Sequence, residues 1–515
     1  MEASRTQKAT RSMSANGIYY IINVLIGLFN RRCLIMIMGI DYQGVNGLFS
    51  SVLSILELAE LGIGTAIIYH LYKPLAENNI EQIKSIMYFY KKCYTMIAVV
   101  IGIIGCLLCT NIEFFVGITE IDLNLKIIFL LMLADIIGTY TFAYKRSILY
   151  ADQKNYIVAN VNTAFVVTYN IAQLIMLYYT HNYYLYLLVK IMTRIGSNMM
   201  INLIVNKEYP YLKNRDSKSL DKDILFDIKK KVKGLMCHKI GTFVVNGTDN
   251  IFISKFIDLA TVGIYANYNY VITAVNSLLN TIIDGATGSV GNLLVRSEKE
   301  HQYKVFKEMN LLNLFISTSA ISIFSVAIED FISLFFGEQY TLQQLVLTVI
   351  IFNMMLNNQR RVWGIMKTAA GIQYEDRFIP LYEAVINLIM SWFLFKFFGL
   401  SGIFMGTIFT QLGVYFYTFP VLVAKNLLGI SYYAYMAYIG KFIAFQAAVV
   451  ALNYSVISQI HVMNRLLSMG IKAFSSGISS MIIFLIVFSK SQEFKDLFRR
   501  LGGLINAKLK KSAKS

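Results

Sequence analysis

Charged side chains lie inside segments that are otherwise apolar enough to cross a membrane. Arg31 and Arg32 stand side by side in LFNRRCLIMIMGI, about eight residues, or roughly 12 Å, from the outer end of their apolar run. Each such charge costs roughly 2.5 to 3.5 kcal/mol at the centre of a membrane helix, so it needs a hydrated cavity or a partner. Adjacent helix residues diverge by about 100 degrees. We therefore expect one arginine to face a cavity and the other to contact a neighbouring helix.

Further basic residues are spaced for the binding of anions. Lys190 and Arg194 are four residues apart, which places both on one face of a helix. Arg360 and Arg361 lie near the inner end of another apolar segment. The planar guanidinium group of arginine fits phosphate oxygens, whereas basic residues near an inner membrane end often extend towards lipid phosphates instead. Both uses stay open for these residues.

Buried acids offer a second kind of chemistry. Glu57 and Glu60 share one helix face, and Asp135 and Asp249 lie within other apolar segments. A carboxylate whose pKa is raised by burial can take up a proton on one side of a membrane and release it on the other. The alternative is that these acids neutralise the arginines of the first segment, for folding or for gating.

The elements that must hold these residues are membrane helices. The chain has 515 residues, of which 56% are hydrophobic and 15% charged, and its mean hydropathy is +0.55. Apolar runs long enough to cross about 30 Å of hydrocarbon recur along the whole chain, and no separate soluble domain is large enough to bury a core. About fourteen spans are predicted, centred in residues 16–39, 43–69, 87–109, 123–149, 157–179, 183–205, 236–256, 262–284, 310–328, 343–367, 378–396, 400–423, 434–456 and 468–489.

The charges between these spans predict the topology. If the N-terminus is cytoplasmic, the basic clusters fall on one side and the opposite loops carry mostly acidic residues, as the positive-inside rule requires. We therefore expect both termini in the cytoplasm. The formal net charge of +17 then reflects topology and anionic lipid headgroups rather than binding of nucleic acid.

The two halves of the chain resemble each other. RCLIMIMGID from Arg32 and DNIFISKFID from Asp249 share their length and their final Ile-Asp, at an offset of 217 residues, from 32 to 249. Parallel repeats of six spans place a transport site between the halves, and the alternative to substrate binding by Arg32 is an ion pair with Asp249 between the lobes. The predicted division is a first lobe at 1–205, a basic amphipathic linker at 206–235, a second lobe at 236–425, two further spans at 426–489 and a basic amphipathic cytoplasmic tail at 490–515.

Two motifs carry a family resemblance. They are GVNGLFSSVLSILELAELGIGTAIIYHLYKPLAENNIEQIKSIMYFYKK, residues 44–92, and NGTDNIFISKFIDLATVGIYANYNYV, which starts at residue 246. With them the chain resembles, over nearly its whole length, the polysaccharide-transport (Wzx-type flippase) branch of the multidrug, oligosaccharidyl-lipid and polysaccharide (MOP) exporter superfamily. The resemblance implies an all-α integral membrane fold, with two six-helix lobes around a central cavity and two additional C-terminal helices, similar to MATE transporters.

The resemblance also implies a function. It predicts a flippase, not an enzyme, that moves undecaprenyl-diphosphate-linked oligosaccharide units of capsule, O-antigen or exopolysaccharide from the inner to the outer leaflet by alternating access. The expected setting is the bacterial plasma (inner) membrane. The expected partners are lipid-linked oligosaccharide and membrane lipids, with polymerase and chain-length proteins of the same pathway, and the protein is expected to be a monomer. No cofactor and no metal are expected, and a proton or sodium gradient would supply the energy.

The resemblance matches Arg31 and Arg32 to basic cavity residues in the first helix of the family. The predicted substrate-binding residues are Arg31, Arg32, Lys190, Arg194, Arg360, Arg361, Tyr265 and Tyr268, and those predicted for ion coupling or gating are Glu57, Glu60, Asp135 and Asp249. The tyrosines of YANYNYV would stack on sugar rings, although tyrosines also form belts at membrane interfaces.

Two other functions stay open. A drug or cation antiporter of the same superfamily is one, but the basic residues of the first lobe would repel a cationic substrate. A membrane polysaccharide polymerase is the other. Such an enzyme would require a long outer loop or a carboxylate-rich site, whereas the predicted outer loops have only about four to fourteen residues.

Overall fold

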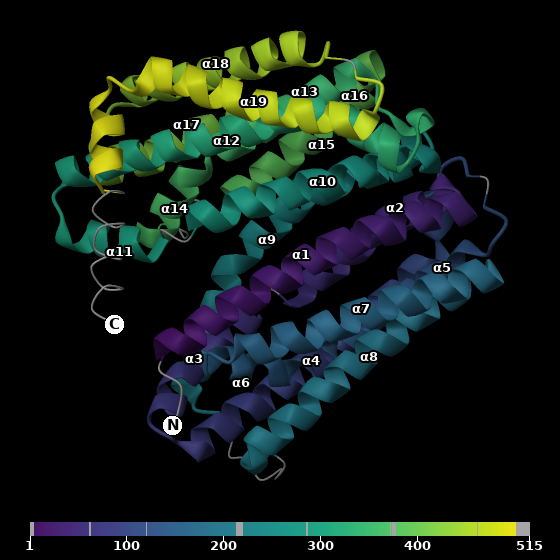
Figure 1. The fold of residues 1–515 in the computed structure, drawn as a ribbon. Coiled ribbons are helices and arrows are strands. Elements are labelled where there is room, and N and C mark those ends of the chain that lie inside the picture. Colours follow the sequence, from purple (N-terminus) through teal and green to yellow (C-terminus); the bar gives the residue numbers. More distant parts are fainter. Residues whose placement is uncertain are drawn as a thin grey trace. The chain divides into compact units, whose positions relative to one another are not determined.

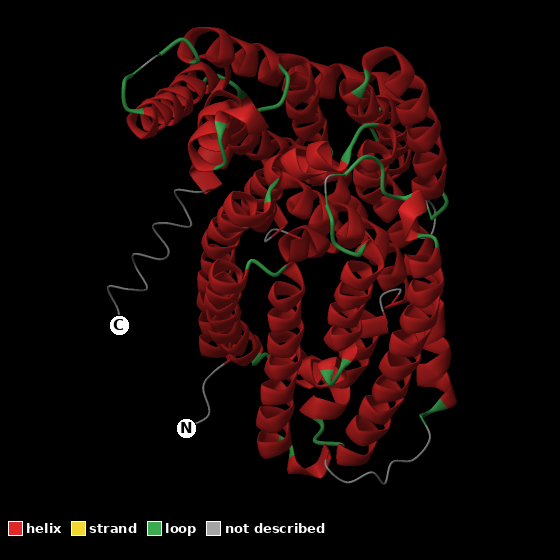
Figure 2. Ribbon diagram, turned by 90° about the vertical axis from the view of Figure 1, so that its right-hand side faces the viewer, coloured by secondary structure: helices red, strands yellow, loops and turns green. Residues whose placement is uncertain are grey.

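The structure, a computed structural model, consists of helices joined by short loops. It describes residues 5–60, 63–119, 121–212, 220–284, 287–370, 372, 377–460 and 462–500. No strand occurs within these ranges (Figure 2). Two compact units divide the chain, unit 1 at Met1–Ala266 and unit 2 at Asn267–Ser515. The all-α class predicted from the sequence is confirmed.

The helices follow the chain as coloured in Figure 1. Unit 1 contains α1 (Arg5–Met38), α2 (Ile40–Glu57), the 3-10 turn η1 (Leu58–Glu60), α3 (Ile63–Ala76), α4 (Ile80–Thr110), α5 (Leu125–Tyr140), α6 (Arg146–Ala151), α7 (Asn155–Thr180), α8 (Tyr183–Glu208), α9 (Lys222–Phe256) and the start of α10 (Leu259–Asp284). Unit 2 contains the rest of α10 and α11 (Thr287–Arg296), α12 (Lys299–Phe335), α13 (Gln344–Gln359), α14 (Arg361–Ala370), α15 (Ile379–Phe398), α16 (Leu400–Thr410), α17 (Phe416–Phe419), α18 (Tyr432–Ile457) and α19 (Arg465–Phe488).

Asparagine side chains set the first residue of several of these helices. Asn79, Asn124 and Asn182 each precede a helix and accept a hydrogen bond from a backbone N–H group in its first turn. Asparagine is a favoured residue at this position because it satisfies a backbone donor that the helix itself leaves unpaired. These residues therefore determine where α4, α5 and α8 begin.

Ten helical segments of the described chain are long and apolar enough to span a membrane. They are Ser14–Met38, Ile80–Thr110, Leu125–Ala151, Asn155–Thr180, Tyr183–Glu208, Lys299–Phe335, Ile379–Phe398, Leu400–Thr418, Tyr432–Ile457 and Arg465–Phe488. The protein is thus a multi-pass membrane protein. The predicted total of fourteen spans is not confirmed, because the segments at 43–69, 236–256, 262–284 and 343–367 are not among the ten.

Two of these four predicted spans are interrupted in the structure. The segment at 43–69 contains α2, then the turn η1, and then α3. The segment at 343–367 contains α13, which ends at Gln359, and α14, which begins at Arg361. A hydropathy window averages over such breaks and reports one apolar run.

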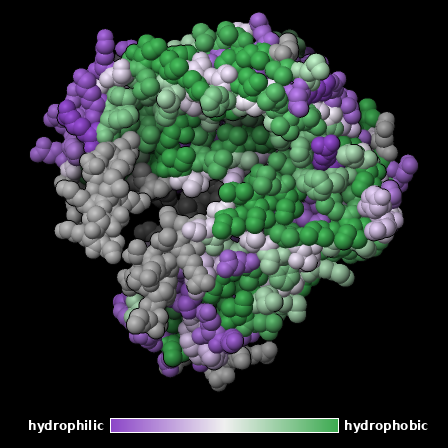
Figure 3. Space-filling model, in the orientation of Figure 1, coloured by the Kyte–Doolittle hydropathy of each residue, from purple (hydrophilic) through white to green (hydrophobic). Residues whose placement is uncertain are grey.

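The outer faces of the helices are rich in apolar side chains. Figure 3 shows large apolar areas, with hydrophilic side chains gathered mainly towards the edges of the view. Leu107, Met192 and Ile486 are examples, with 64%, 72% and 73% of their surface exposed. Such extensive exposed apolar surface is expected of helices that face lipid.

Glycines bring α2 against the start of α10 within unit 1. A Cβ atom placed on Gly44 would lie 2.0 Å from the carbonyl oxygen of Leu259, and one on Gly263 would lie 2.5 Å from that of Ile40. Neither distance is compatible with a side chain. Small residues allow membrane helices to approach this closely, so these two glycines fix the contact of α2 with α10.

A buried amide network holds α1 to α7 and α8. Asn30 Nδ2 donates to Asn170 Oδ1 at 2.8 Å, and the Tyr186 hydroxyl donates to Asn30 Oδ1 at 2.7 Å. Gln173 Nε2 donates to the carbonyl oxygen of Tyr186 at 2.9 Å. Buried polar groups of this kind specify one arrangement of the helices, because each needs its partner. The network therefore fixes the position of Asn30, the residue before Arg31.

Candidate functional site

A polar pocket lies within unit 1 among α1, α6, α7 and α8. It has a volume of about 260 Å³. Its lining residues are Tyr19, Asn23, Arg146, Asn162, Phe165, Val166, Tyr169, Lys190, Thr193, Arg194 and Ser197. We call it the basic pocket, because the ionisable side chains that carry charge in it at neutral pH are Arg146, Lys190 and Arg194.

Two of these bases share one acid on the neighbouring helix. Lys190 Nζ lies 3.1 Å from Asp135 Oδ2, and Arg194 Nε donates to Asp135 Oδ1 at 3.2 Å. Asp135 has a side chain that is only 8% exposed, whereas the side chains of Lys190 and Arg194 are 33% and 42% exposed. The acid is therefore enclosed, and both bases keep surface that a ligand can reach.

The sequence itself brings these residues to the same depth. The Asn124 cap begins α5 at Leu125 and the Asn182 cap begins α8 at Tyr183. Asp135 then lies roughly 15 Å along α5, and Arg194 roughly 17 Å along α8, at 1.5 Å per residue. The spacing of Lys190 and Arg194 puts both on the face that meets α5. Asp135, predicted for coupling or gating, lies here as the partner of both bases.

Arg146 is a site residue that the sequence analysis missed. It begins the short helix α6, and its Nη2 donates to Asn198 Oδ1 at 2.6 Å. Its Nε is buried and has no hydrogen-bond partner among the described residues. Arg146 belongs to the basic run Lys145–Lys154, which charge counting assigns to a cytoplasmic loop. No spacing signal distinguishes it, because its pocket neighbours come from α7 and α8.

The pocket carries an excess of positive charge. Three bases, Arg146, Lys190 and Arg194, line it, and one acid, Asp135, pairs with the last two, which leaves a formal excess of two. Amide and aromatic groups such as Asn162 complete the lining. Charge-assisted hydrogen bonds from arginine and lysine bind phosphate and carboxylate groups. The pocket is therefore arranged to hold an anion.

The first pair of predicted arginines lies outside this lining. Arg31 is half-buried, and its Nη1 donates to the carbonyl oxygen of Ala266 at 3.2 Å, which joins α1 to α10. Arg32 is also half-buried on α1. Asp249 is 8% exposed on α9. Both Arg32 and Asp249 belong to unit 1, so an ion pair between them would join helices of one unit.

The predicted residues of unit 2 are engaged in contacts of their own. Arg361 lies with Nη2 3.2 Å from Asp284 Oδ2, and Arg360 with Nη1 3.8 Å from Glu383 Oε1. Tyr268 is fully buried, and its hydroxyl accepts a hydrogen bond from the backbone N–H of Leu342 at 3.1 Å. Because that ring is enclosed, it offers no face to a sugar.

The remaining predicted residues stay within unit 1. Tyr265 is partly buried on α10, and Glu57 is exposed at the end of α2. Glu60 accepts a hydrogen bond from the Tyr94 hydroxyl at 2.6 Å. None of these three side chains lines the basic pocket.

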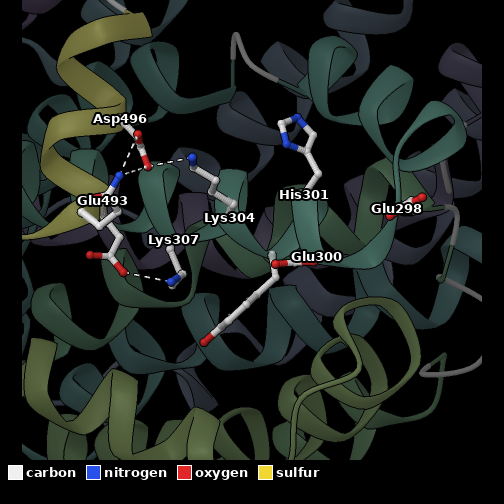
Figure 4. A pocket seen from close by; sticks show the side chains of 9 residues that line it. Glu298, Glu300, His301, Lys304, Lys307, Glu493 and Asp496 are labelled. Carbon is white, nitrogen blue, oxygen red and sulfur yellow. Dashed lines mark hydrogen bonds and ion pairs between the residues drawn. The ribbon is translucent and has the colours of Figure 1, made fainter.

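A second pocket, of about 420 Å³, lies in unit 2 where α12 begins (Figure 4). Its lining residues are Glu298, Glu300, His301, Tyr303, Lys304, Lys307, Gln492, Glu493 and Asp496. Lys304 Nζ lies 2.8 Å from Asp496 Oδ2, and Lys307 Nζ lies 2.9 Å from Glu493 Oε1. These two ion pairs, which we call the tail clasp, join the helical turns at 492–500 to α12. The predicted tail therefore docks on the protein over this part, and its residues after 500 lie outside the described chain.

The tail clasp should weaken in acid and when its acids are neutralised. The hydrogen bond from Lys304 lowers the pKa of Asp496 below 3.8, and for Glu493 burial opposes, but does not cancel, the lowering of the pKa by Lys307. Because these pKa values are lowered by docking, the stabilisation is complete at neutral pH and is lost as pH falls through them. We expect Asp496→Asn to raise hydrogen exchange of the 492–500 amides roughly two- to fivefold at neutral pH. Lys126→Gln, which removes an exposed pair with Glu113 in unit 1, should leave it unchanged, and equal exchange in Asp496→Asn would contradict the clasp.

The fold and the charged pocket define a helical membrane protein of several spans. No family model matches the sequence, and no curated protein matches it. Among solved structures the chain is similar to one described as the lipid II flippase MurJ in an inward closed conformation, with a TM-score of 0.67, 12% identity, and coverage of 92% of this chain and 98% of that one. It is also similar to the inward-facing conformation of a multidrug resistance MATE family transporter of the MOP superfamily, with a TM-score of 0.56, 13% identity, and coverage of 84% and 99%. The chain thus shares the fold of these two structures.

Proposed function

We propose that this protein is a flippase for lipid-linked oligosaccharide and that the basic pocket holds the diphosphate of the lipid. The observation that carries the proposal is the lining of one pocket by Arg146, Lys190 and Arg194, of which the last two share the enclosed Asp135, so that the group has a formal excess of two positive charges. A lipid diphosphate has at least two negative charges, and the fork of arginine matches its oxygens. The fold shared with a structure described as a lipid II flippase supports the same class of substrate.

The size of the pocket agrees with a headgroup. Its volume of about 260 Å³ is below the range of about 300–1,000 Å³ typical of pockets that enclose a drug-sized ligand. A diphosphate and the first part of a sugar fit such a space better than a whole oligosaccharide. Tyr19 and Tyr169 in the lining offer ring faces to a sugar.

The cation antiporter is the second candidate, supported by the fold shared with a multidrug resistance MATE family transporter. The charge of the basic pocket opposes it, because a cationic drug would meet Arg146, Lys190 and Arg194 before it reached Asp135. Asp135 is enclosed, and each of its oxygens already faces a base. An anionic substrate is therefore favoured by electrostatics.

We propose the bacterial plasma membrane as the location, with both termini in the cytoplasm. On this orientation the Asn182 cap of α8 is at the outer side, and Arg194 is about halfway through a hydrocarbon layer of about 30 Å. The substrate would enter from the inner leaflet as product of lipid-linked glycan assembly. A polymerase and chain-length proteins would act after it.

The proposal is tested with proteoliposomes that contain a fluorescent undecaprenyl-diphosphate-oligosaccharide. We expect the wild-type protein to expose inner-leaflet substrate to a membrane-impermeant quencher, and to do so far more slowly for a lipid in which an uncharged linker replaces the diphosphate. The matched control is liposomes without protein. Transport of a cationic dye with no movement of the diphosphate lipid would overturn the proposal and favour the antiporter.

A further inference from the structure

A chain of hydrogen bonds in unit 1 ends on one of the buried acids. The Tyr90 hydroxyl donates to the hydroxyl oxygen of Tyr94 at 2.8 Å, and the Tyr94 hydroxyl donates to Glu60 Oε1 at 2.6 Å. The two tyrosines lie one turn apart on α4 and are 3% and 8% exposed. Glu60 ends the turn η1 between α2 and α3. We call these three residues the tyrosine–glutamate chain.

The helix α3 comes close to the tyrosine–glutamate chain at Gly64, where an added side chain would crowd it. A Cβ atom on Gly64 would lie 2.9 Å from the Tyr90 hydroxyl, 3.0 Å from Glu60 Oε1 and 3.3 Å from the Tyr94 hydroxyl. Three oxygen atoms thus converge on the backbone of α3. The converging atoms belong to η1 and α4, and the backbone belongs to α3. The tyrosine–glutamate chain is therefore a tertiary contact and not a contact between neighbours in the sequence.

The two tyrosines of the tyrosine–glutamate chain follow each other along the axis of α4. Tyr90 lies roughly 15 Å and Tyr94 roughly 21 Å along α4 from its first residue, Ile80. On the predicted topology Ile80 is at the cytoplasmic side, so the tyrosines lead from the inner side towards the middle of the membrane, where Glu60 lies. Hydrogen-bonded hydroxyls in such a position can pass a proton from one to the next without moving their rings.

The other charged and titratable groups near Glu60 do not extend the tyrosine–glutamate chain beyond this acid. Tyr140 of α5 lies within electrostatic range of Glu60, as do the two tyrosines of α4, and Glu57 of α2 lies within range of Tyr140. The helix α9 also packs against η1, and it brings no ionic partner to Glu60 among the side chains that the structure describes. Asp135, by contrast, is neutralised by Lys190 and Arg194. Glu60 thus has a hydrogen-bonded path to it and, among the side chains that the structure describes, no ion pair with a base.

We propose that Glu60 is a proton-binding site that exchanges its proton with the cytoplasmic side through Tyr94 and Tyr90. In release, protonated Glu60 gives its proton to the Tyr94 oxygen, Tyr94 gives its own proton to the Tyr90 oxygen, and Tyr90 gives its own proton to water. Both phenols end neutral, the carboxylic acid becomes a carboxylate, and the water becomes hydronium. Uptake is the reverse. The coupling of this proton to transport rests on the proposed flippase function.

The first test uses proteoliposomes with an imposed pH gradient. We expect the gradient to stimulate translocation by the wild-type protein, and Glu60→Gln to lose this stimulation while it keeps exchange of substrate in the absence of a gradient. Tyr94→Phe and Tyr90→Phe should lose most of the stimulation. The matched control is Tyr140→Phe, since the Tyr140 ring contacts that of Tyr94 at 5.4 Å but its hydroxyl is outside the chain. It should behave as wild type.

The second test needs no substrate. Infrared difference spectra between acidic and alkaline buffer should contain a protonated carboxylic acid band that is absent from Glu60→Gln and shifted in Tyr94→Phe, because its hydrogen-bond donor is lost. Tyr140→Phe should keep the band unchanged. A wild-type spectrum in Glu60→Gln, or full stimulation by the gradient in that variant, would overturn the proton site. If no variant and no wild-type protein moves the lipid, the flippase proposal fails while the spectra still decide on Glu60.

Discussion

Replacing Arg146 with glutamine should reduce the rate of oligosaccharide translocation about ten- to hundredfold without loss of folded protein. That range corresponds to the roughly 1.5–3 kcal/mol of one hydrogen bond to a charged group. The variant is a clean test because Arg146 is held by Asn198 and Ser197, both neutral. Its removal leaves no acid without a partner. Initial rates in proteoliposomes, measured against substrate concentration, give the result.

The controls for this prediction come from the same unit. Lys126→Gln also removes one positive charge, but its ion pair with Glu113 is exposed, and exposed pairs contribute little. It should transport as wild type. Equal losses in Arg146→Gln and Lys126→Gln would mean that overall charge, and not the pocket, matters. Unchanged transport in Arg146→Gln would remove this residue from the substrate site.

Replacing the acid that Lys190 and Arg194 share should have the opposite effect on substrate affinity. Asp135→Asn would release Lys190 and Arg194 from their partner, so a bound diphosphate should be held more tightly. We expect a lower KM together with a lower maximal rate, because release becomes slower. Lys190→Gln should instead raise KM, while Arg194 still neutralises Asp135. A rise of KM in Asp135→Asn would indicate that the acid itself binds the substrate.

Replacing Gly44 with alanine should destabilise unit 1. The added methyl group would lie 2.0 Å from the carbonyl oxygen of Leu259, so α2 and α10 would have to separate. Overpacking of this kind costs typically about 1–3 kcal/mol. We expect lower yield of monodisperse protein and a lower midpoint of thermal unfolding in detergent.

A second glycine provides the comparison. Gly17 lies on α1 with no atom within 4 Å of an added Cβ, and replacing glycine by alanine inside a helix is favourable by about 0.5–1 kcal/mol. Gly17→Ala should therefore equal or slightly exceed the wild-type midpoint. An unchanged midpoint in Gly44→Ala would show that α2 and α10 are not in close contact in the membrane.

Composition and hydropathy were sufficient to predict a multi-pass, all-α membrane protein. They predicted about fourteen spans, of which ten are long apolar helices among the described residues, and two of the other four contain a turn, η1, or a break, at Arg360, that an apolar run does not reveal. A window of apolar residues averages over both. The capping asparagines are visible in the sequence, but they mark helix starts and not which helices become neighbours.

The site was only partly accessible from the sequence. The spacing of Lys190 and Arg194 predicted one basic face, which the structure presents to Asp135. No periodicity indicated that α5 would supply the acid, since that depends on tertiary packing. Arg146 was missed because the positive-inside rule already accounts for a basic residue near a cytoplasmic loop. The roles of Arg31, Arg32 and the other candidate residues stay predictions.

The length of α12 has a mechanical consequence. Its 37 residues extend about 55 Å at 1.5 Å per residue, whereas the hydrocarbon core is about 30 Å thick. On the predicted topology the Lys299 end projects into the cytoplasm, and the ion pairs of the tail clasp join the tail to α12 near this end. A tilt of about 10 degrees would move one end of such a rod about 10 Å relative to the other. The docked tail thus lies at the end of α12 that moves most when the helix tilts. A small tilt within the bilayer would displace the tail far enough for a spectroscopic label to detect.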